Sequence, residues 1–236
     1  MRINLYDTKI SMLLSNGFKK SKKDQQPTTV LFIRHGENEW TESHKLAGRT
    51  PGVHLNEYGR QQAEALGKRL ADVKLNAIYA SPLERTMETA QAIAQHHQLE
   101  VKAHPGILEV DYGEWTGEPI KKLSKTKAWP VIQSYPTGAG FPSGETMYGM
   151  QARCVQEINQ LVAIHPGETI AVVGHADLIK AAVAHYLGAH FDLFQRIMIS
   201  TASITAISFS PMGPRVLGVN DTSHNPPRPA KKKAKN

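Results

Sequence analysis

The sequence predicts a three-layer α/β/α sandwich around a mostly parallel sheet. Short apolar runs alternate with stretches of helical periodicity between residues 27 and 220, and polar side chains directly follow three of the apolar runs. Alternating strands and helices are typical of folds in which helices cover both faces of a parallel sheet. The predicted strands span 29–34, 77–80, 169–174 and 203–209, with 215–219 as a further candidate, and the predicted helices span 57–72, 83–97, 145–164 and 176–187.

The predicted strands are short and almost entirely apolar. Residues 30–33 read Val-Leu-Phe-Ile, residues 77–80 read Ala-Ile-Tyr-Ala, and residues 169–174 read Thr-Ile-Ala-Val-Val-Gly. A strand that lacks polar alternation is typically buried on both faces, as in the middle of a parallel sheet. The helix over 83–97 and the helix over 145–164 each have one apolar face. The apolar face of the helix over 145–164 consists of Met147, Met150, Cys154, Val155, Ile158, Leu161 and Val162. We therefore expect Cys154 in the core.

Length and composition are those of one globular domain. The chain has 236 residues, of which 40% are hydrophobic and 21% are charged, and this is enough to build a substantial core. The single cysteine excludes an internal disulfide and is compatible with a reducing compartment, so we predict a cytoplasmic location. No apolar run approaches the roughly 18 residues that a membrane span requires.

The net charge of +7 belongs to the two ends of the chain. Residues 1–26 carry six basic and two acidic side chains, and residues 221–236 carry five basic and one acidic, so each has a net charge of +4 and residues 27–220 carry −1. We therefore predict a domain over 27–220 and expect no sequence-specific nucleic-acid binding, although the basic tails could contact anionic partners.

The two tails differ in composition. Residues 221–236 are rich in proline and lysine, which predicts disorder. Residues 1–26 form a basic extension with an amphipathic helical pattern from Ile3 to Phe18, which could dock on the core, on an anionic membrane surface or on a partner. We expect that removing residues 1–26 and 222–236 leaves folding and activity nearly intact.

Polar residues gather at the ends of three predicted strands. Arg34-His35 follows the first strand, a serine and Arg85 follow the second, and His175-Ala176-Asp177 follows 169–174. Because the carboxyl ends of parallel strands share one edge of the sheet, two arginines and two histidines are expected to meet there. Guanidinium groups and helix amino termini are suited to tetrahedral anions such as phosphate. The sequence has no Walker-type glycine loop, no His-x-x-x-His pair and no cysteine cluster, so we expect neither a nucleotide triphosphate loop nor a metal.

Six ordered motifs resemble those of the histidine phosphatase superfamily, in its phosphoglycerate-mutase-like branch (branch 1). They run from about residue 29 to about residue 210 and read LFIRHGENEW, GRTPGVHLNEYGRQQA, SPLERTMETA, ILEVDYGEWTG, PSGET and VVGHADLIK. The resemblance implies a phosphoglycerate-mutase-like fold, with His35 as the nucleophile that accepts the phosphoryl group and Glu109 as the proton donor. It also implies that Arg34, Arg85 and His175 bind the phosphate, and that neither a metal nor an organic cofactor is required.

Further residues of these motifs are predicted to contact the substrate, namely Asn38, Thr41, Arg49, Tyr112 and Ala176. His35 must be neutral at its attacking nitrogen, so its other ring N–H should donate to a backbone carbonyl. The chain departs from the family pattern at three places, with Thr41 for an asparagine, Lys180 for an arginine and Ala176-Asp177 for a glycine-rich pair. Asp177 has two possible roles: it faces the substrate, or it caps or lines the start of its helix. We favour the role at the helix start, where aspartate is generally favourable.

The resemblance leaves the reaction open between hydrolysis and mutase action. We favour a phosphomonoester hydrolase because the segment from Gly117 to Gly144 is short and its glycines predict mobility, whereas a mutase needs a long closing lid. The lysines at 121, 122, 125 and 127 are interpreted as the exposed face of a lid helix. A non-catalytic binding protein is disfavoured because His35, Glu109 and His175 are all present. The predicted partner is a small phosphomonoester, and the sequence does not determine which one. A homodimer is compatible with the sequence.

Overall fold

A six-stranded sheet runs through the middle of the structure, a computed structural model that describes residues 26–228. The strand order is β3-β2-β4-β1-β5-β6, and the pairs among β3, β2, β4 and β1 are parallel, whereas β5 pairs antiparallel with both β1 and β6. The strands are β1 (Thr28–Arg34), β2 (Ala77–Ala80), β3 (Val101–Ala103), β4 (Thr169–Gly174), β5 (Ile204–Ser210) and β6 (Gly213–Asp221).

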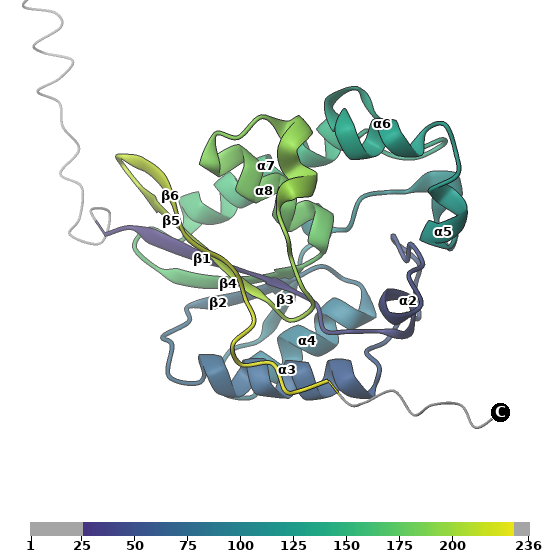
Figure 1. The fold of residues 1–236 in the computed structure, drawn as a ribbon. Coiled ribbons are helices and arrows are strands. Elements are labelled where there is room, and N and C mark those ends of the chain that lie inside the picture. Colours follow the sequence, from purple (N-terminus) through teal and green to yellow (C-terminus); the bar gives the residue numbers. More distant parts are fainter. Residues whose placement is uncertain (1–25, 229–236) are drawn as a thin grey trace, which may run out of the picture.

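Helices cover both faces of this sheet (Figure 1). Helices α3 (Glu57–Leu70) and α4 (Glu84–Ala94) lie on one face, and α7 (Met147–Ile164) and α8 (Ala176–Leu187) lie on the other. Three shorter helices stand at the side where β1 ends, namely α2 (Glu39–Glu42), α5 (Ile120–Leu123) and α6 (Trp129–Ser134). The predicted α/β/α sandwich is confirmed, with an antiparallel hairpin at one edge of the mostly parallel sheet.

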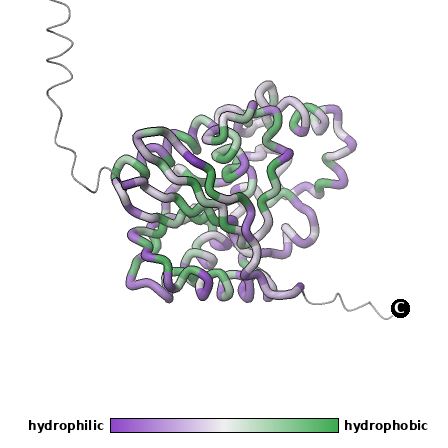
Figure 2. The backbone as a smooth tube through the Cα atoms, turned by 60° about the vertical axis from the view of Figure 1, so that its left-hand side comes forward, coloured by the Kyte–Doolittle hydropathy of each residue, from purple (hydrophilic) through white to green (hydrophobic). Residues whose placement is uncertain are grey.

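Strand β1 explains why the sheet is buried on both sides. Val30 and Phe32 pack with residues of α7 and α8, whereas Leu31 and Ile33 pack with residues of α3 and α4. Each fully buried side chain of this kind contributes about 1.5–3 kcal/mol of hydrophobic stabilisation. Figure 2 shows the hydrophobic strands enclosed by more polar helices and loops. Cys154 is fully buried in the same core as predicted, and burial raises the pKa of its thiol to about 12.

The sequence pattern located the long elements and missed short ones. Each of the four predicted helices and five predicted strands is present, with boundaries that move by up to three residues. Strand β3 was not predicted because three residues, Val-Lys-Ala, are too few to show a period. Between residues 26 and 228, no helix has both the length and the apolar character needed to cross a membrane.

The segment 117–144 is better packed than its glycines predicted. It forms α5 and α6, and Leu123, Ile132 and Phe141 are buried in an apolar cluster that also includes Phe191 and Phe194. The indole rings of Trp115 and Trp129 stack with their centroids 6.1 Å apart. Apolar side chains on its two short helices pack it against α8 and the turn that follows, which its glycine content did not predict. Its lysines at 121, 122, 125 and 127 are exposed, as expected.

The predicted disorder of residues 221–236 is also wrong for the first part of that tail. Asp221 ends β6, and residues 222–228 lie along α3, where the Tyr58 hydroxyl donates a hydrogen bond to the carbonyl of Pro226 (2.9 Å). A proline-rich composition predicted disorder because it lacks apolar side chains, but hydrogen bonds to the domain hold this segment. Residues 229–236 and the predicted amphipathic helix in residues 1–25 lie outside the described residues.

Candidate active site

The predicted histidines and arginines meet at the carboxyl ends of three parallel strands. His35 follows β1, His175 follows β4, and Arg85 lies in the first turn of α4, one short turn after β2. The two imidazole rings are in edge contact, with their centroids 5.3 Å apart, and both histidines are buried. Arg34, His35, Arg85, Glu109 and His175 are called the site cluster below.

His35 is held in one orientation and one tautomer. Its Nδ1 lies 2.7 Å from the carbonyl oxygen of Gly36, which can only accept, so Nδ1 carries the proton and Nε2 keeps its lone pair. Burial, and then the charges of Arg85 and Arg34, lower the pKa of His35 well below its usual value. His35 is therefore a neutral imidazole with a free nucleophilic nitrogen, and the expected contact with a backbone carbonyl is present.

His175 is fixed between two polar groups. Its Nε2 lies 2.9 Å from the Ser81 hydroxyl, and its Nδ1 lies 3.3 Å from Nη2 of Arg85. A guanidinium only donates, so Nδ1 accepts and Nε2 donates to Ser81. Burial and then the charge of Arg85 lower the pKa of His175 well below its usual value, so it is neutral in this arrangement.

Several buried donors of the site have no partner within the described part of the chain. They are Nε of Arg34, Nδ2 of Asn38, and Nε and Nη1 of Arg85. Other donors of the same guanidiniums fix their orientation, because Arg34 Nη1 donates to the Ile199 carbonyl (2.7 Å) and Arg85 Nη2 donates to the Gly48 carbonyl (2.7 Å). A buried donor without an acceptor is costly, so this set of cations and amide is suited to an anion with several oxygens.

Glu109 supplies a carboxyl group that can hold a proton near neutral pH. Burial, together with the nearby carboxylate of Asp177, raises the pKa of Glu109 to about 7, against the lowering effects of the Val110 N–H and the two arginines. Its Oε1 accepts a hydrogen bond from the Val110 backbone (3.0 Å). A carboxyl with a pKa near the working pH is suited to general acid and general base catalysis.

A network of ion pairs holds the loop that carries Glu109, which we call the acid loop (residues 106–112). Glu145 accepts hydrogen bonds from Arg153 Nε (2.8 Å) and Nη2 (3.0 Å) and from Arg49 Nη2 (3.0 Å). Arg153 also donates to the carbonyls of Gly106 and Leu108, and Arg49 Nε donates to the carbonyl of Glu109 (2.9 Å). Side chains from three separate segments therefore fix the position of the acid loop.

The other predicted substrate contacts have different surroundings. Arg49 uses its guanidinium to hold the acid loop, as described above. Asn38 caps α2 through its Oδ1, which accepts from the Thr41 N–H (2.9 Å) and hydroxyl (3.2 Å), while its Nδ2 is one of the unpaired donors. Ala176 begins α8 directly after His175, so it offers a helix amino terminus to the site.

Tyr112 and Asp177 connect the acid loop with α8. The buried Tyr112 hydroxyl donates to Oδ2 of Asp177 (2.9 Å), and Lys180 Nζ lies 3.3 Å from Oδ1. Burial and then the charge of Asp177 raise the pKa of Tyr112, which keeps this hydroxyl protonated. His175 occupies the cap position of α8, and Asp177 lies in the first turn, where it bonds to these two side chains.

Sequence reasoning did not assign a role to three residues that contact the site. Ser81 bonds to His175, Thr89 Oγ1 accepts from the Gly36 N–H (3.0 Å), and Glu145 holds the acid loop through two arginines. The position of Ser81 directly after β2 was a usable signal, because the other strand ends carry site residues. Thr89 lies inside a helix, and Glu145 acts through long-range pairs, so neither had a local signal.

The site and the fold together define a class, an α/β protein with an anion-compatible site of buried cations at its strand ends. A sequence model of the histidine phosphatase superfamily (branch 1) matches residues 30–222. This chain belongs to that superfamily and is an enzyme of the histidine phosphatase type, as its motifs predicted.

Two curated relatives and one solved structure illustrate the likeness. "Phosphoserine phosphatase 1" of Hydrogenobacter thermophilus is 29% identical over 203 residues, which cover 83% of this chain and 93% of the relative. "Phosphoglycerate mutase-like protein 4" of Arabidopsis thaliana is 32% identical over 164 residues, covering 67% and 71%. A mutant phosphoserine phosphatase from Entamoeba histolytica, solved in complex with phosphoserine, superposes with a TM-score of 0.77 at 27% identity and covers 84% of this chain and 98% of its own. The predicted phosphoglycerate-mutase-like fold is confirmed.

Proposed function

We propose that this enzyme hydrolyses small phosphomonoesters through a phosphohistidine on His35. The observation that carries the proposal is the neutral His35, with a free Nε2, beside buried arginine donors that have no partner in the described chain. In the first step Nε2 attacks phosphorus, the N–P bond forms, and the bond from phosphorus to the leaving oxygen breaks. Arg34 and Arg85 stabilise the phosphoryl oxygens, and His175, bonded to Ser81 and to Arg85, lines the same phosphate site.

Glu109 acts in both steps. Its proton goes to the leaving oxygen in the first step, which leaves a carboxylate beside the phosphohistidine. In the second step this carboxylate takes a proton from water as the water oxygen attacks phosphorus, the N–P bond breaks, and His35 returns to its neutral form. A pKa of about 7 suits Glu109 to both directions of proton transfer near neutral pH.

The second candidate is phosphoryl transfer of the mutase type. It has support from the relative named phosphoglycerate mutase-like protein, and from the apolar packing of the segment 117–144, which is suited to a lid that excludes water. Hydrolysis has support from the two phosphoserine phosphatases. We therefore place hydrolysis first, with phosphoserine among the substrates to be tried.

The test is a panel of phosphomonoesters that includes phosphoserine, 2- and 3-phosphoglycerate, sugar phosphates and nucleotides. We expect release of inorganic phosphate, together with a phosphoenzyme that is labile in acid and stable in base, as a phosphoramidate should be. Phosphorus NMR with 3-phosphoglycerate and a trace of the bisphosphate separates the alternatives. Formation of 2-phosphoglycerate without inorganic phosphate would establish mutase action, and the lack of any phosphoenzyme would contradict both candidates.

Three wider statements belong to the same proposal. A cytoplasmic location has support from the lone, buried Cys154, which suits a reducing compartment. Contacts of the basic tails with anionic partners have support from their net charge alone. A homodimer is the assembly we would test first, by light scattering of the full chain.

A further inference from the structure

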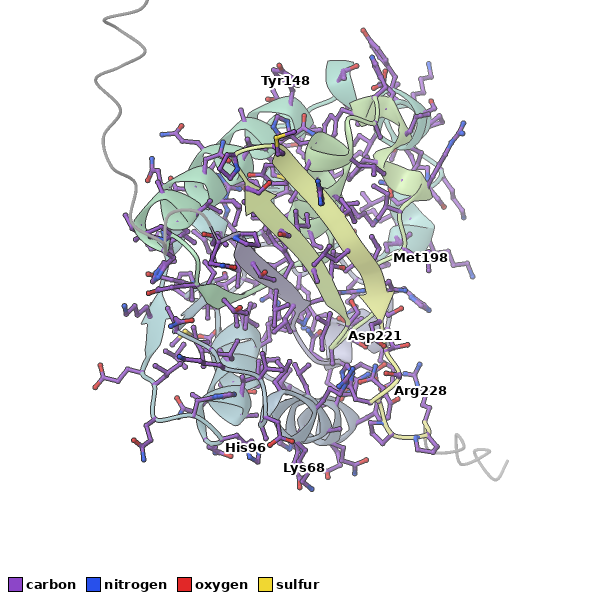
Figure 3. The ribbon with its side chains drawn as sticks, turned by 90° about the vertical axis from the view of Figure 1, so that its left-hand side faces the viewer. Lys68, His96, Tyr148, Met198, Asp221 and Arg228 are labelled. Atoms are coloured by element: carbon purple, nitrogen blue, oxygen red, sulfur yellow. The ribbon has the colours of Figure 1, made fainter. Side chains whose placement is uncertain are left out.

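The C-terminal segment 222–228 returns from the edge of the sheet to the neighbourhood of the nucleophile. Three hydrogen bonds hold it, namely His224 Nε2 to the Ala202 carbonyl (2.8 Å), Asn225 Nδ2 to the Thr201 carbonyl (3.1 Å), and the Tyr58 hydroxyl to the Pro226 carbonyl (2.9 Å). Figure 3 shows the chain leaving β6 at Asp221 and continuing to Arg228 beside α3. The segment therefore follows a defined path across the domain and ends near α2.

At the end of this path Arg228 pairs with a buried carboxylate. Its Nη2 lies 2.7 Å from Oε2 of Glu37, whose side chain is only 7% exposed. The guanidinium also lies over the Tyr58 ring, 5.7 Å from its centroid, and 3.8 Å from Glu42. Asn56 Nδ2 also donates to the Glu37 carboxylate, at Oε1 (3.1 Å). A buried carboxylate is stabilised by a hydrogen-bonded cation, and Arg228 is such a partner of Glu37.

Glu37 belongs to the loop that sets the tautomer of His35. The carbonyl between Gly36 and Glu37 accepts the hydrogen bond from His35 Nδ1, and the Glu37 N–H donates to Gln62 Oε1 (2.9 Å). This loop sits against the start of α3 so closely that a Cβ atom at Gly59 would lie 1.9 Å from the Glu37 carbonyl oxygen. A small shift of Glu37 would therefore move the acceptor on which the orientation of His35 depends.

We propose that Arg228 is a positioning residue for the nucleophile, acting through its ion pair with Glu37. The pair joins positions 191 residues apart and makes the C-terminal segment part of the active-site structure. This proposal replaces the expectation from sequence that removal of residues 222–236 leaves activity nearly intact. When Arg228 is absent, the Glu37 carboxylate loses its hydrogen-bonded cation, moves toward water and carries the Gly36–Glu37 peptide with it, so His35 loses its fixed orientation. The proposal rests on the nucleophile role given to His35 above.

The experiment compares Arg228→Gln, Arg228→Lys, Glu37→Gln and the double variant Glu37→Gln/Arg228→Gln in the full chain. Arg215→Gln, at an exposed arginine of β6, is the matched control. With 4-nitrophenyl phosphate we expect Arg228→Gln to lower kcat about tenfold while KM changes little, because substrate-binding groups stay in place. Arg228→Lys should fall between this variant and wild type, since it keeps the charge and loses the planar geometry.

The double variant gives the readout that separates positioning from loss of fold. Removing the carboxylate charge should make Arg228 dispensable, so Glu37→Gln/Arg228→Gln should match Glu37→Gln alone in kcat and in melting temperature. A further loss of the same size in the double variant would overturn the proposal, as would kcat of Arg228→Gln within twofold of the control. If Arg228→Gln is too unstable to assay, the comparison of the double variant with Glu37→Gln decides alone.

A second measurement does not depend on turnover. Nitrogen-15 NMR of the histidine rings reports which nitrogen of His35 carries the proton. We expect wild type and Arg215→Gln to keep the Nδ1–H tautomer, and Arg228→Gln to show a mixture of tautomers. If no phosphomonoester is hydrolysed but the tautomer still responds to Arg228, the proposed function fails and the positioning role stands. An unchanged tautomer in Arg228→Gln contradicts the positioning role whatever the activity.

Discussion

The loop that carries His35 and the loop that carries Glu109 face the same site, but different forces hold them. Two backbone hydrogen bonds fix His35 between neighbouring segments. Its N–H donates to the Gly174 carbonyl (3.0 Å), and its carbonyl accepts from the Ala202 N–H (3.2 Å). The acid loop depends instead on Glu145 and two arginines, whose side chains are 20–33% exposed. The backbone of the nucleophile is thus a continuation of the sheet, with an ion pair, Glu37–Arg228, at the next residues of its loop. The acid loop is held mainly by charged side chains, together with a backbone bond from the Glu145 N–H to the Asp111 carbonyl (2.9 Å).

This difference predicts how each side responds to change. Ion pairs near the surface weaken with salt and with titration, whereas backbone hydrogen bonds inside a sheet do not. Substitutions on the nucleophile side should therefore affect every substrate. Substitutions on the acid side should affect mainly the step that transfers a proton, and should do so in a manner that depends on pH and leaving group.

The largest effect is expected for His35→Ala. Loss of the nucleophile should lower turnover of any phosphomonoester by on the order of 10⁴-fold or more, because no other neutral imidazole in the site has a free nitrogen toward the substrate. The measurement is phosphate release with wild type, His35→Ala and the control His185→Ala, an exposed histidine of α8. Activity of His35→Ala within tenfold of wild type would remove His35 from its assigned role.

Glu109→Gln should separate substrates by their leaving group. Alkyl phosphates need a proton on the leaving oxygen, so their rate should fall about 10²–10³-fold, whereas 4-nitrophenyl phosphate should lose far less. The comparison is best made on the burst of the first turnover, which reports formation of the phosphoenzyme and not its hydrolysis. Equal losses for both kinds of substrate in the burst would contradict the acid role.

Glu145→Gln should disturb the acid loop and leave the nucleophile unaffected. We expect about a tenfold loss on alkyl phosphates and a smaller one on 4-nitrophenyl phosphate, since the loop is less well fixed. The free energy of unfolding should drop by about 2 kcal/mol, because Arg49 and Arg153 lose a partly buried partner. Glu100→Gln, at an exposed position, is the control. An equal loss on both substrates would mean that the network also supports His35.

The same variant has a signature in the pH dependence of stability. Burial acts to raise the pKa of Glu145, but the bonds and charges of Arg153 and Arg49 outweigh it and hold the pKa below its usual value. Its contribution to stability is therefore present above the usual glutamate pKa and is lost as the pH falls through the lowered value. Denaturant melts between pH 7 and pH 3 should show a smaller decline for Glu145→Gln than for wild type.

The smallest effect is expected for Asp177→Asn, in the pH profile of kcat/KM. Glu109 must be protonated for the first step, so the rate on alkyl phosphates should decline above about pH 7 in wild type. The carboxylate of Asp177 disfavours ionisation of Glu109, and its removal lets the charges of Arg85 and Arg34 and the Val110 N–H lower the pKa further.

The declining limb of Asp177→Asn should therefore move to lower pH, by up to about one unit. Besides Glu109 and the two arginines, the Asp177 carboxylate also faces Lys180 and Tyr112, to which it is hydrogen-bonded. Asp72→Asn, at an exposed site after α3, should leave the limb in place. A limb that stays at the same pH in Asp177→Asn would show that burial alone sets the pKa of Glu109.

Much of the fold and the centre of the site could be predicted from local patterns. The strand 29–34 is an uninterrupted apolar run, so its burial and the position of Arg34-His35 at its end follow from sequence. Parallel strands place their carboxyl ends together, which brought His175 and Arg85 to the same edge. The disorder of residues 222–228 was predicted from composition, and that prediction was wrong because a few specific hydrogen bonds hold this segment. The apolar packing of the segment 117–144 was not predicted, because it depends on contacts with distant residues.

The layers of sheet and helices, the buried strands and the residues at the strand ends could all be predicted from the sequence, because each depends on periodicity and apolar content within about ten neighbouring residues. Which polar side chains pair became visible only in the folded chain. Arg228 reaches Glu37 across 191 positions, Glu145 reaches Arg49 across 96, and Ser81 reaches His175 across 94. Such pairs depend on where the packed core places distant loops. The residues next to a polar side chain in the sequence therefore do not predict its long-range partner.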